Sequence, residues 1–160
     1  MNSPRLILTK TTADDLNTLF EFQRDPKGIF LAAFTPGNPD DKAGYLSRYG
    51  NFLKDPSIIM MTIWLDEKIV GSISRYVMEG DHEITYWIDT AHWGKGIATT
   101  ALKMFLEIDT IRPIYGRVVI DNFGSQKVLE YNGFVRIGKD SGFANGRQTE
   151  VEEYIYKLEL

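Results

Sequence analysis

Hydrophobic and polar residues follow two different periods along this chain, and the changes of period predict the order of its elements. Stretches rich in β-branched and aromatic residues, with alternating or continuous apolar positions, predict strands at residues 5–9, 58–65, 68–76, 82–88, 113–120, 134–138 and 150–158. Apolar residues that recur three and four positions apart predict amphipathic helices at residues 12–25, 38–53, 96–107 and 122–132. This mixture predicts an α/β (α+β) fold, with a central sheet of about seven strands flanked by helices.

Residues that favour helix ends refine these boundaries. Thr12, Asn38 and Asn122 are predicted N-caps, because their side-chain oxygens can accept hydrogen bonds from the first free backbone N–H groups of a helix. The pair Asn132-Gly133 predicts a helix that ends in the left-handed conformation.

The connecting segments are less regular. Residues 28–37 predict a loop or a broken helix, and residues 140–148, which are rich in glycine and asparagine, predict a turn-rich loop. Asp66-Glu67 separates two strands and predicts a hairpin. Because Asp-Glu is not a favoured two-residue turn, we expect the hairpin loop to be longer than two residues.

Composition narrows the classes of function. The chain has 160 residues, of which 43% are hydrophobic and 25% charged, and this ordinary globular composition predicts a single domain over residues 1–160. There is no cysteine, which excludes disulfides, a cysteine nucleophile and thiolate metal sites. Because His82 and His92 are the only histidines, we expect no metal site.

Charge and hydropathy bear on partners and location. The formal net charge is −4, so we expect neither nucleic acid nor a membrane as a partner, and an anionic ligand would need local donors. The polar start of the sequence does not resemble a signal peptide, and no apolar run is long enough to span a bilayer. These features predict a cytoplasmic protein.

A glycine-rich turn is the first candidate for chemistry. It reads Trp93-Gly94-Lys95-Gly96-Ile97-Ala98-Thr99, and it lies between the strand at residues 82–88 and an apolar helix. A helix start presents free N–H groups and the positive end of the helix dipole, and glycines let a ligand approach the backbone, so this turn is a candidate phosphate cradle. Neither G-x-x-x-x-G-K-[ST] nor G-x-G-x-x-G is present, so a P-loop and a dinucleotide-binding Rossmann site are unsupported.

The turn instead matches the pattern Q/R-x-x-G-x-G/A, with Trp93, Gly96 and Ala98 at its first, fourth and sixth positions. It resembles the acetyl-CoA pyrophosphate loop of the GNAT N-acetyltransferases. The tryptophan in the first position resembles the branch that acetylates the N-termini of ribosomal proteins, as does the opening segment at residues 5–26. Residues 122–134 resemble the N-x-x-S-x-x-V-L-E-x-x-G-F helix and turn of the same family, in the expected order and spacing.

The resemblance implies a GNAT acyl-CoA N-acyltransferase fold: a mixed, mostly antiparallel sheet in which one parallel pair of strands splays to admit the cofactor. It implies that acetyl-CoA, as co-substrate, places its pyrophosphate on the backbone N–H groups of Trp93, Gly94, Lys95, Gly96, Ile97, Ala98 and Thr99, with the Thr99 hydroxyl as an added donor. The pantetheine would pair with the strand edge at Ile88, Asp89 and Thr90. For Trp93, a packing role is the alternative to binding.

The helix at residues 122–132 is implied to complete the cofactor site. Asn122 would lie on the cofactor arm, and Ser125 would touch the cofactor and donate a proton to the departing thiolate. The alternatives are that Asn122 only caps its helix and that Ser125 only packs. Many members of the family carry a tyrosine donor at the position of Leu129, so the proton donor departs from the common pattern here.

Acetyl transfer to an amine also needs a base, because an alkyl ammonium has a pKa of about 10. Glu83 is the candidate, since it lies on the strand beside the expected thioester; a solvent-facing strand glutamate is the alternative. His82 titrates in a suitable range but faces the other side of the strand.

The predicted function is acetyl-CoA-dependent N-acetylation of a primary amine, on a protein N-terminus or a small molecule, by direct transfer in a ternary complex. A non-catalytic acyl-CoA-binding or sensor module is the alternative. Tyr45, Tyr49 and Phe52 share one helix face and either line the acceptor pocket or belong to the core. An acidic groove would favour a polyamine or aminoglycoside, and an open groove a peptide. Whether the protein is a monomer or a homodimer is left open.

Overall fold

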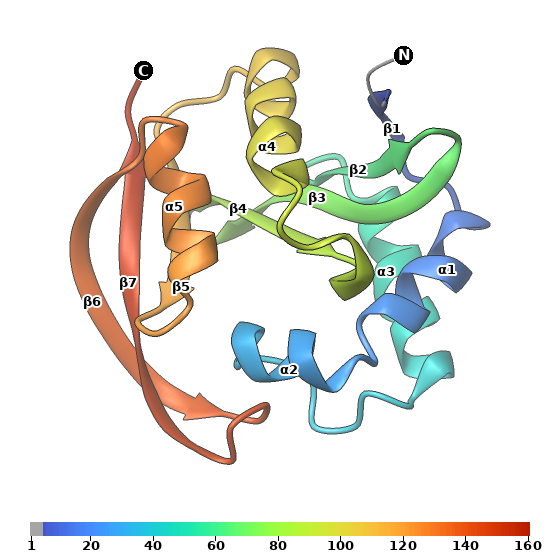
Figure 1. The fold of residues 1–160 in the computed structure, drawn as a ribbon, viewed down its shortest axis with the longest axis horizontal. Helices are drawn as coiled ribbons and strands as arrows, with labels where there is room; N and C mark the ends of the chain where they lie inside the picture. Colours follow the sequence, from blue (N-terminus) through green and yellow to red (C-terminus); the bar gives the residue numbers. More distant parts are fainter. Residues whose placement is uncertain (1–4) are drawn as a thin grey trace.

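A seven-stranded mixed sheet forms the centre of the computed structural model, which describes residues 5–160 (Figure 1). The strand order across the sheet is β1-β2-β3-β4-β5-β7-β6. The strands are β1 (Leu6–Lys10), β2 (Ile59–Leu65), β3 (Lys68–Met78), β4 (Asp81–Ile88), β5 (Ile114–Val119), β6 (Val135–Ala144) and β7 (Thr149–Leu158). The helices are α1 (Asp15–Phe22), α2 (Pro26–Ala32), α3 (Lys42–Lys54), the short 3-10 helix η1 (Thr90–His92), α4 (Ile97–Ile108) and α5 (Phe123–Tyr131).

The pairing between β4 and β5 is unlike that of the other strands. Neighbouring strands are antiparallel throughout the described sheet except for this pair, which is parallel. Its register contains two residue pairs, Glu83 with Tyr115 and Ile84 with Gly116. Beyond Ile84, β4 continues to Ile88 and pairs only with β3 on its other side. The sheet therefore opens between β4 and β5, as the resemblance implied.

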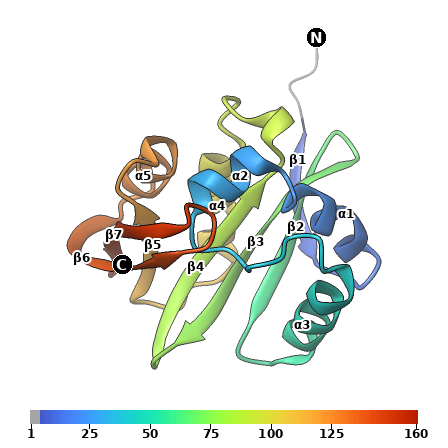
Figure 2. The same ribbon diagram turned by 90° about the horizontal axis from the view of Figure 1, so that it is seen from below.

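The two faces of the sheet carry different helices (Figure 2). On one face, α4 and α5 bury an apolar core that includes Ile73, Leu102 and Phe105, each fully buried. On the other face, α1 and α3 pack with Phe20 and Tyr45 against β2 and β3. Burying one such side chain contributes about 1.5–3 kcal/mol, so the larger core on the α4 side fixes β4 and the start of α4 in place.

Helix α2 is held at both of its ends. Its first residue is Pro26, and the Asp25 side chain caps it by accepting a hydrogen bond from the Lys27 N–H at 2.8 Å. The turn between β6 and β7 contacts the other end, where the Gly146 N–H donates to the Ala33 carbonyl at 2.8 Å and the Arg147 guanidinium lies 3.8 Å from the centre of the Phe30 ring. Contacts this remote in sequence give α2 a fixed position over the opening in the sheet.

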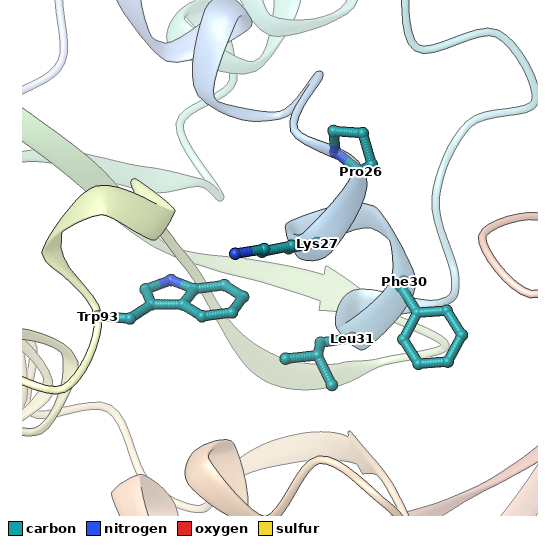
Figure 3. A pocket seen from close by; sticks show the side chains of 5 residues that line it. All are labelled: Pro26, Lys27, Phe30, Leu31 and Trp93. Atoms are coloured by element: carbon teal, nitrogen blue, oxygen red, sulfur yellow. The ribbon is translucent and has the colours of Figure 1, made fainter.

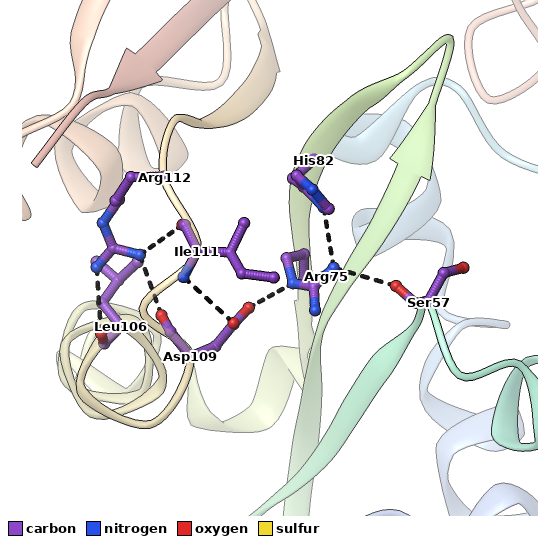
Figure 4. A network of polar contacts seen from close by, with 7 residues as sticks. All are labelled: Ser57, Arg75, His82, Leu106, Asp109, Ile111 and Arg112. Atoms are coloured by element: carbon purple, nitrogen blue, oxygen red, sulfur yellow. Dashed lines mark hydrogen bonds and ion pairs between the residues drawn. The ribbon is translucent and has the colours of Figure 1, made fainter.

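A buried ion pair ties the end of α4 to β3 (Figure 4). Arg75 on β3 donates to the Asp109 carboxylate just after α4, and both side chains are about 5% exposed or less. The same guanidinium reaches Nδ1 of His82 at 2.9 Å and the Ser57 carbonyl at 3.1 Å. Arg112 donates to the carbonyl of Leu106 in the last turn of α4, where a positive charge complements the helix dipole.

Two predicted N-caps are wrong, by two residues for α1 and by three for α3. Thr12 is not the N-cap of α1; its backbone N–H donates to the Asp15 side chain at 3.0 Å, and the helix begins at Asp15 after a tight turn. Asn38 does not cap α3, because its side chain accepts from the Asp40 N–H two residues on and closes a local turn. Asp41 caps α3 instead, through the Gly44 N–H at 3.0 Å.

The loops also differ from expectation. Asp66 and Glu67 do form a two-residue hairpin turn, both with positive φ, and the Asp66 side chain accepts from the Arg5 N–H at 2.8 Å, which stabilises it. Strand β6 runs to Ala144, so residues 140–144 are strand rather than loop. Residues 28–37, predicted as a loop or a broken helix, include most of the short helix α2, so the second alternative fits. Gly133 has a φ of 89°, and this confirms the left-handed end predicted after α5. None of the helices in residues 5–160 is long and apolar enough to cross a bilayer.

Candidate functional site

The turn before α4 has the open backbone that an anion site needs. Gly94 and Gly96 adopt positive φ values of 80° and 73°, and Gly96 is the residue that caps α4. A Cβ added at either glycine would meet nothing within 4 Å, so the space above the turn is open. By helix geometry, the N–H groups of Ile97, Ala98 and Thr99 have no carbonyl partner within the helix and are available to a ligand.

Trp93 fixes this turn to the end of β4. Its indole N–H donates to the Ile88 carbonyl at 3.0 Å, while its side chain stays partly exposed. Just before it, the Thr90 hydroxyl donates to the Asp25 carboxylate that caps α2. This hydrogen bond lowers the pKa of Asp25, so the carboxylate stays ionised and holds α2 beside the turn.

The hydrogen bonds along β4 define which backbone groups face the opening. The Asp89 N–H donates to the Val70 carbonyl of β3 at 2.8 Å. Since backbone groups alternate in direction along a strand, Ile84, Tyr86 and Ile88 direct theirs toward β5. Of these, Ile84 lies in the paired segment, so the amides of Tyr86 and Ile88 face the opening. Of the three residues expected to pair with the pantetheine, Ile88 directs its N–H toward the opening, whereas the Asp89 N–H is engaged by β3.

Helix α5 brings the second motif to the same opening. The Asn122 side chain accepts from the Ser125 N–H at 3.2 Å and donates to the Leu31 carbonyl of α2 at 3.3 Å, so Asn122 caps α5 and also links it to α2. The Ser125 hydroxyl lies 2.6 Å from the Tyr86 hydroxyl. Burial raises the pKa of Tyr86, and the hydrogen bond with Ser125 opposes this shift only in part, so the phenol keeps its proton at neutral pH.

Tyr86 was not among the residues predicted for the site. Strand alternation indicated that it shares a face with Ile84 and Ile88, but nothing in the sequence indicated that α5 lies opposite. Leu129, at the position where many relatives carry a tyrosine, is buried, and its methyl groups lie 3.0 and 3.1 Å from where a Cβ on Gly116 would stand. The hydroxyl pair of Tyr86 and Ser125 thus occupies the α5 side of the opening.

Glu83 lies on the opposite face of β4 and is not solvent-facing, since the residue is 3% exposed. Its Oε1 accepts a hydrogen bond from Nε of Arg117 on β5 at 3.1 Å, and Nη1 of Arg117 also bonds Glu153 and Asp140. Burial raises the pKa of Glu83 above its usual range, although the positive charge of Arg117 opposes the shift. Burial raises the pKa of Tyr76 on β3, and the nearby negative charge of Glu83 raises it further.

A pocket of about 410 Å³ lies between α2 and the turn before α4 (Figure 3). Pro26, Lys27, Phe30 and Leu31 line it from α2, and Trp93 lines it from the turn. In Figure 3, the Lys27 ammonium points toward the Trp93 indole and Leu31 points into the same space. We call this the α2 pocket.

A second pocket, of about 260 Å³, lies on the α1–α3 face of the sheet beside the opening. We call it the aromatic pocket, because aromatic rings line much of it: Phe22, Tyr45, Tyr49, Phe52, Tyr76 and Trp87. Tyr86 also borders it, although its ring lies on the α5 face of β4. The rest of the lining is aliphatic or uncharged polar: Leu19, Gln23, Ile58, Met60, Ser72, Ser74 and Thr85. Tyr45 is buried in the core around α1, and all three aromatic residues of α3 line this pocket.

The aromatic pocket is neutral near pH 7. Burial raises the pKa of Tyr45, Tyr49 and Tyr76, so these phenols keep their protons. The Trp87 ring forms the wall toward α2, packs against Gly28 and donates its N–H to the Phe22 carbonyl at 3.2 Å.

Comparisons with known proteins agree with this arrangement. A family model described as an acetyltransferase (GNAT) domain matches residues 5–135. The chain is similar to the ribosomal-protein-serine acetyltransferase of Escherichia coli (strain K12), with 30% identity over 104 residues that span 59% of this chain and 58% of that protein. The chain spans between 45% and 58% of the length of the curated relatives it matches.

Two solved structures illustrate the shared fold. A ribosomal-protein-alanine N-acetyltransferase from Brucella melitensis has a TM-score of 0.81 at 16% identity, over 96% of this chain and 99% of that one. A spermidine N-acetyltransferase from Vibrio cholerae, solved with CoA and spermine, has a TM-score of 0.78 at 20% identity, over 95% of each chain. The family match includes the turn before α4, the open edge of β4 and all of α5. From this match and the fold, we conclude that the chain belongs to the GNAT acetyltransferase family.

Proposed function

We propose that this protein transfers an acetyl group from acetyl-CoA directly to a primary amine within a ternary complex. The observation that carries the proposal is the opening between β4 and β5, with the glycine turn at one end and the Tyr86–Ser125 hydroxyl pair on one side. A chain without cysteine suits direct transfer, since no covalent enzyme intermediate is required.

The residues around the opening fit acetyl-CoA. The turn from Trp93 to Thr99 offers free N–H groups and open space for a pyrophosphate, and Lys95 and Lys27 bring positive charge near it in a chain whose net charge is −4. The backbone groups of Tyr86 and the N–H of Ile88, whose carbonyl is taken by Trp93, would pair with the pantetheine arm. Asn122 and Ser125 would flank it. When bound, acetyl-CoA supplies an acetyl thioester with a thiolate leaving group.

We assign the role of base to Glu83. An alkyl ammonium with a pKa of about 10 must lose a proton before it attacks, and a carboxylate whose pKa is raised by burial accepts that proton more readily than an exposed one. Glu83 lies on the face of β4 that carries the aromatic pocket, next to the pocket residue Tyr76. Arg117 would hold the carboxylate in place through its hydrogen bond to Oε1.

We assign the role of proton donor to Ser125, acting with Tyr86. The two hydroxyls share one short hydrogen bond, so a proton that Ser125 gives to the thiolate can be replaced from Tyr86, which would in turn regain a proton from water at the opening. Glu83 and Tyr86 project to opposite faces of β4, so the base and the donor would stand on opposite sides of the reacting carbonyl. The unpaired Tyr86 amide would polarise that carbonyl.

The acceptor is either a protein N-terminus or a small amine. Similarity to the ribosomal-protein-serine acetyltransferase supports the first, and similarity in fold to the spermidine N-acetyltransferase is compatible with the second.

A calorimetric titration tests the proposal. We expect the protein to bind acetyl-CoA and CoA but not ATP, and then to release thiol from acetyl-CoA when an amine panel is added. No binding of acetyl-CoA by a folded sample would overturn the proposal. Binding without turnover of any amine would instead support a non-catalytic acyl-CoA sensor.

A further inference from the structure

The aromatic pocket carries information about the acceptor that goes beyond the reaction type. It touches the open edge of the sheet through Thr85, Tyr86 and Trp87 of β4, so an acceptor seated there would have its amine beside the Tyr86 amide. We propose that the acceptor is a small monoamine, whose amine is joined by a short chain to a single aromatic ring or similar apolar group. This inference rests on the proposed acetyl transfer and names its substrate class.

The size of the pocket limits the acceptor. A cavity of ~150 Å³ is enough to hold benzene. The pocket has about 260 Å³, which leaves room for one ring and a two- or three-atom linker to the amine. The Trp87 wall, closed on its far side by Gly28, keeps the pocket from extending toward α2.

The lining matches an apolar group. The rings of Tyr45, Tyr49 and Phe52 contact one another in sequence along α3, the first pair tilted and the second edge-on, with ring centres 4.5 and 5.0 Å apart. They form an aromatic wall of the pocket. Aromatic side chains arranged in this way favour edge and offset contacts with another ring. Of the residues that line the pocket, none carries a formal charge at neutral pH.

The same lining opposes a second positive charge on the acceptor. A second buried ammonium needs a second carboxylate close by, and the carboxylate behind Tyr76, that of Glu83, is paired with Arg117 and already assigned to the reacting amine. Aromatic faces attract cations, but the Tyr49 ring already has the Arg48 guanidinium 5.4 Å from its centre. Polyamines and aminoglycosides, which carry several ammonium groups, would therefore be excluded.

The test compares hexylamine with 1,5-diaminopentane, two amines of equal heavy-atom count that differ in one charge. Three further ligands are included: 2-phenylethylamine, spermidine and a tripeptide that begins with serine. Two readouts are used: calorimetric binding to the protein saturated with CoA, and kcat/KM from thiol release with acetyl-CoA. We expect both hexylamine and 2-phenylethylamine to exceed 1,5-diaminopentane by about 10-fold or more in each readout. Equal or reversed preference, or a tripeptide that exceeds 2-phenylethylamine, would overturn the inference.

A matched pair of variants isolates the charge. Tyr49→Glu and Tyr49→Gln both remove the ring, and they differ only in the carboxylate placed in the pocket. We expect Tyr49→Glu, relative to Tyr49→Gln, to shift the preference toward 1,5-diaminopentane by about 10-fold. An unchanged ratio would count against the pocket as the acceptor site. If either variant does not fold, the amine pair on the unaltered protein decides the matter.

The two proposals fail differently. Selective binding of the monoamines without thiol release from acetyl-CoA would leave the ligand class intact and refute the transfer reaction. Turnover of diamines as fast as monoamines would leave the reaction intact and refute the ligand class.

Discussion

Replacing Gly96 by alanine separates the cofactor cradle from the stability of the fold. Gly96 has a φ of 73°, where a Cβ destabilises the backbone by about 1–2 kcal/mol. For a chain of this size, that loss lowers the Tm by about 2–8 °C. The new Cβ would stand in the open space above the turn, where nothing lies within 4 Å, and would block a phosphate oxygen from the N–H groups at the start of α4. Loss of one charge-assisted hydrogen bond weakens affinity by about 10- to 150-fold.

Gly80 provides the matched control. It lies in the turn between β3 and β4, has a φ of 87°, and a Cβ there also meets nothing within 4 Å. Gly80→Ala should therefore lower the Tm by a similar amount, while the affinity of this variant for acetyl-CoA stays as in the unaltered protein. The Tm is measured by thermal unfolding with and without acetyl-CoA, and the affinity by calorimetry. If Gly96→Ala binds acetyl-CoA as tightly as Gly80→Ala, the turn does not hold the pyrophosphate.

Three further substitutions test other parts of the structure. Glu83→Gln should lower kcat/KM by about 100-fold or more and remove the acidic limb of its pH profile, which should lie above the usual range of a glutamate because burial raises the pKa; an unchanged profile would exclude Glu83 as the base. Ser125→Ala should lower kcat more than Tyr86→Phe does, while the affinity of both variants for acetyl-CoA, measured by calorimetry, stays nearly constant. Equal kcat values for the unaltered protein and the two variants would refute the assignment of Ser125 as donor. Arg75→Met should leave the buried Asp109 carboxylate unpaired and lower the free energy of unfolding by about 3–5 kcal/mol in urea titrations, whereas Arg75→Met combined with Asp109→Leu should recover most of it.

The sequence predicted those parts of the site that are local in the chain. The turn before α4 and the cap of α5 depend on residues within a few positions of one another, so their patterns were sufficient. The partners of Tyr86 and Glu83 lie 39 and 34 positions away, and only the tertiary fold brings them together. Sequence periodicity therefore placed both side chains on the correct faces of β4 but could not say what they touch.

The wrong predictions of strand β6 and of the turn at Asp66-Glu67 have a similar cause. Strand β6 lies at the edge of the sheet and is exposed along most of its length, so its residues show no alternation, and a register shift near Arg136 interrupts the pattern further. The tight turn at Asp66-Glu67 is stabilised by Arg5, which is distant in sequence. Where a segment is fixed by such a remote partner, its own residues carry a weak signal.

The contact between the α2 region and the turn after β6 has a consequence for how the protein folds. Asn145 bonds the Thr35 carbonyl across 110 positions, and Arg147 bonds the Phe30 carbonyl across 117. Contacts with such large sequence separation form late, because a long loop must close first. On the ribosome, α2 would therefore reach its final position only after the β6–β7 hairpin has been made. The α2 pocket of the newly synthesised protein would therefore form only when the β6–β7 hairpin docks.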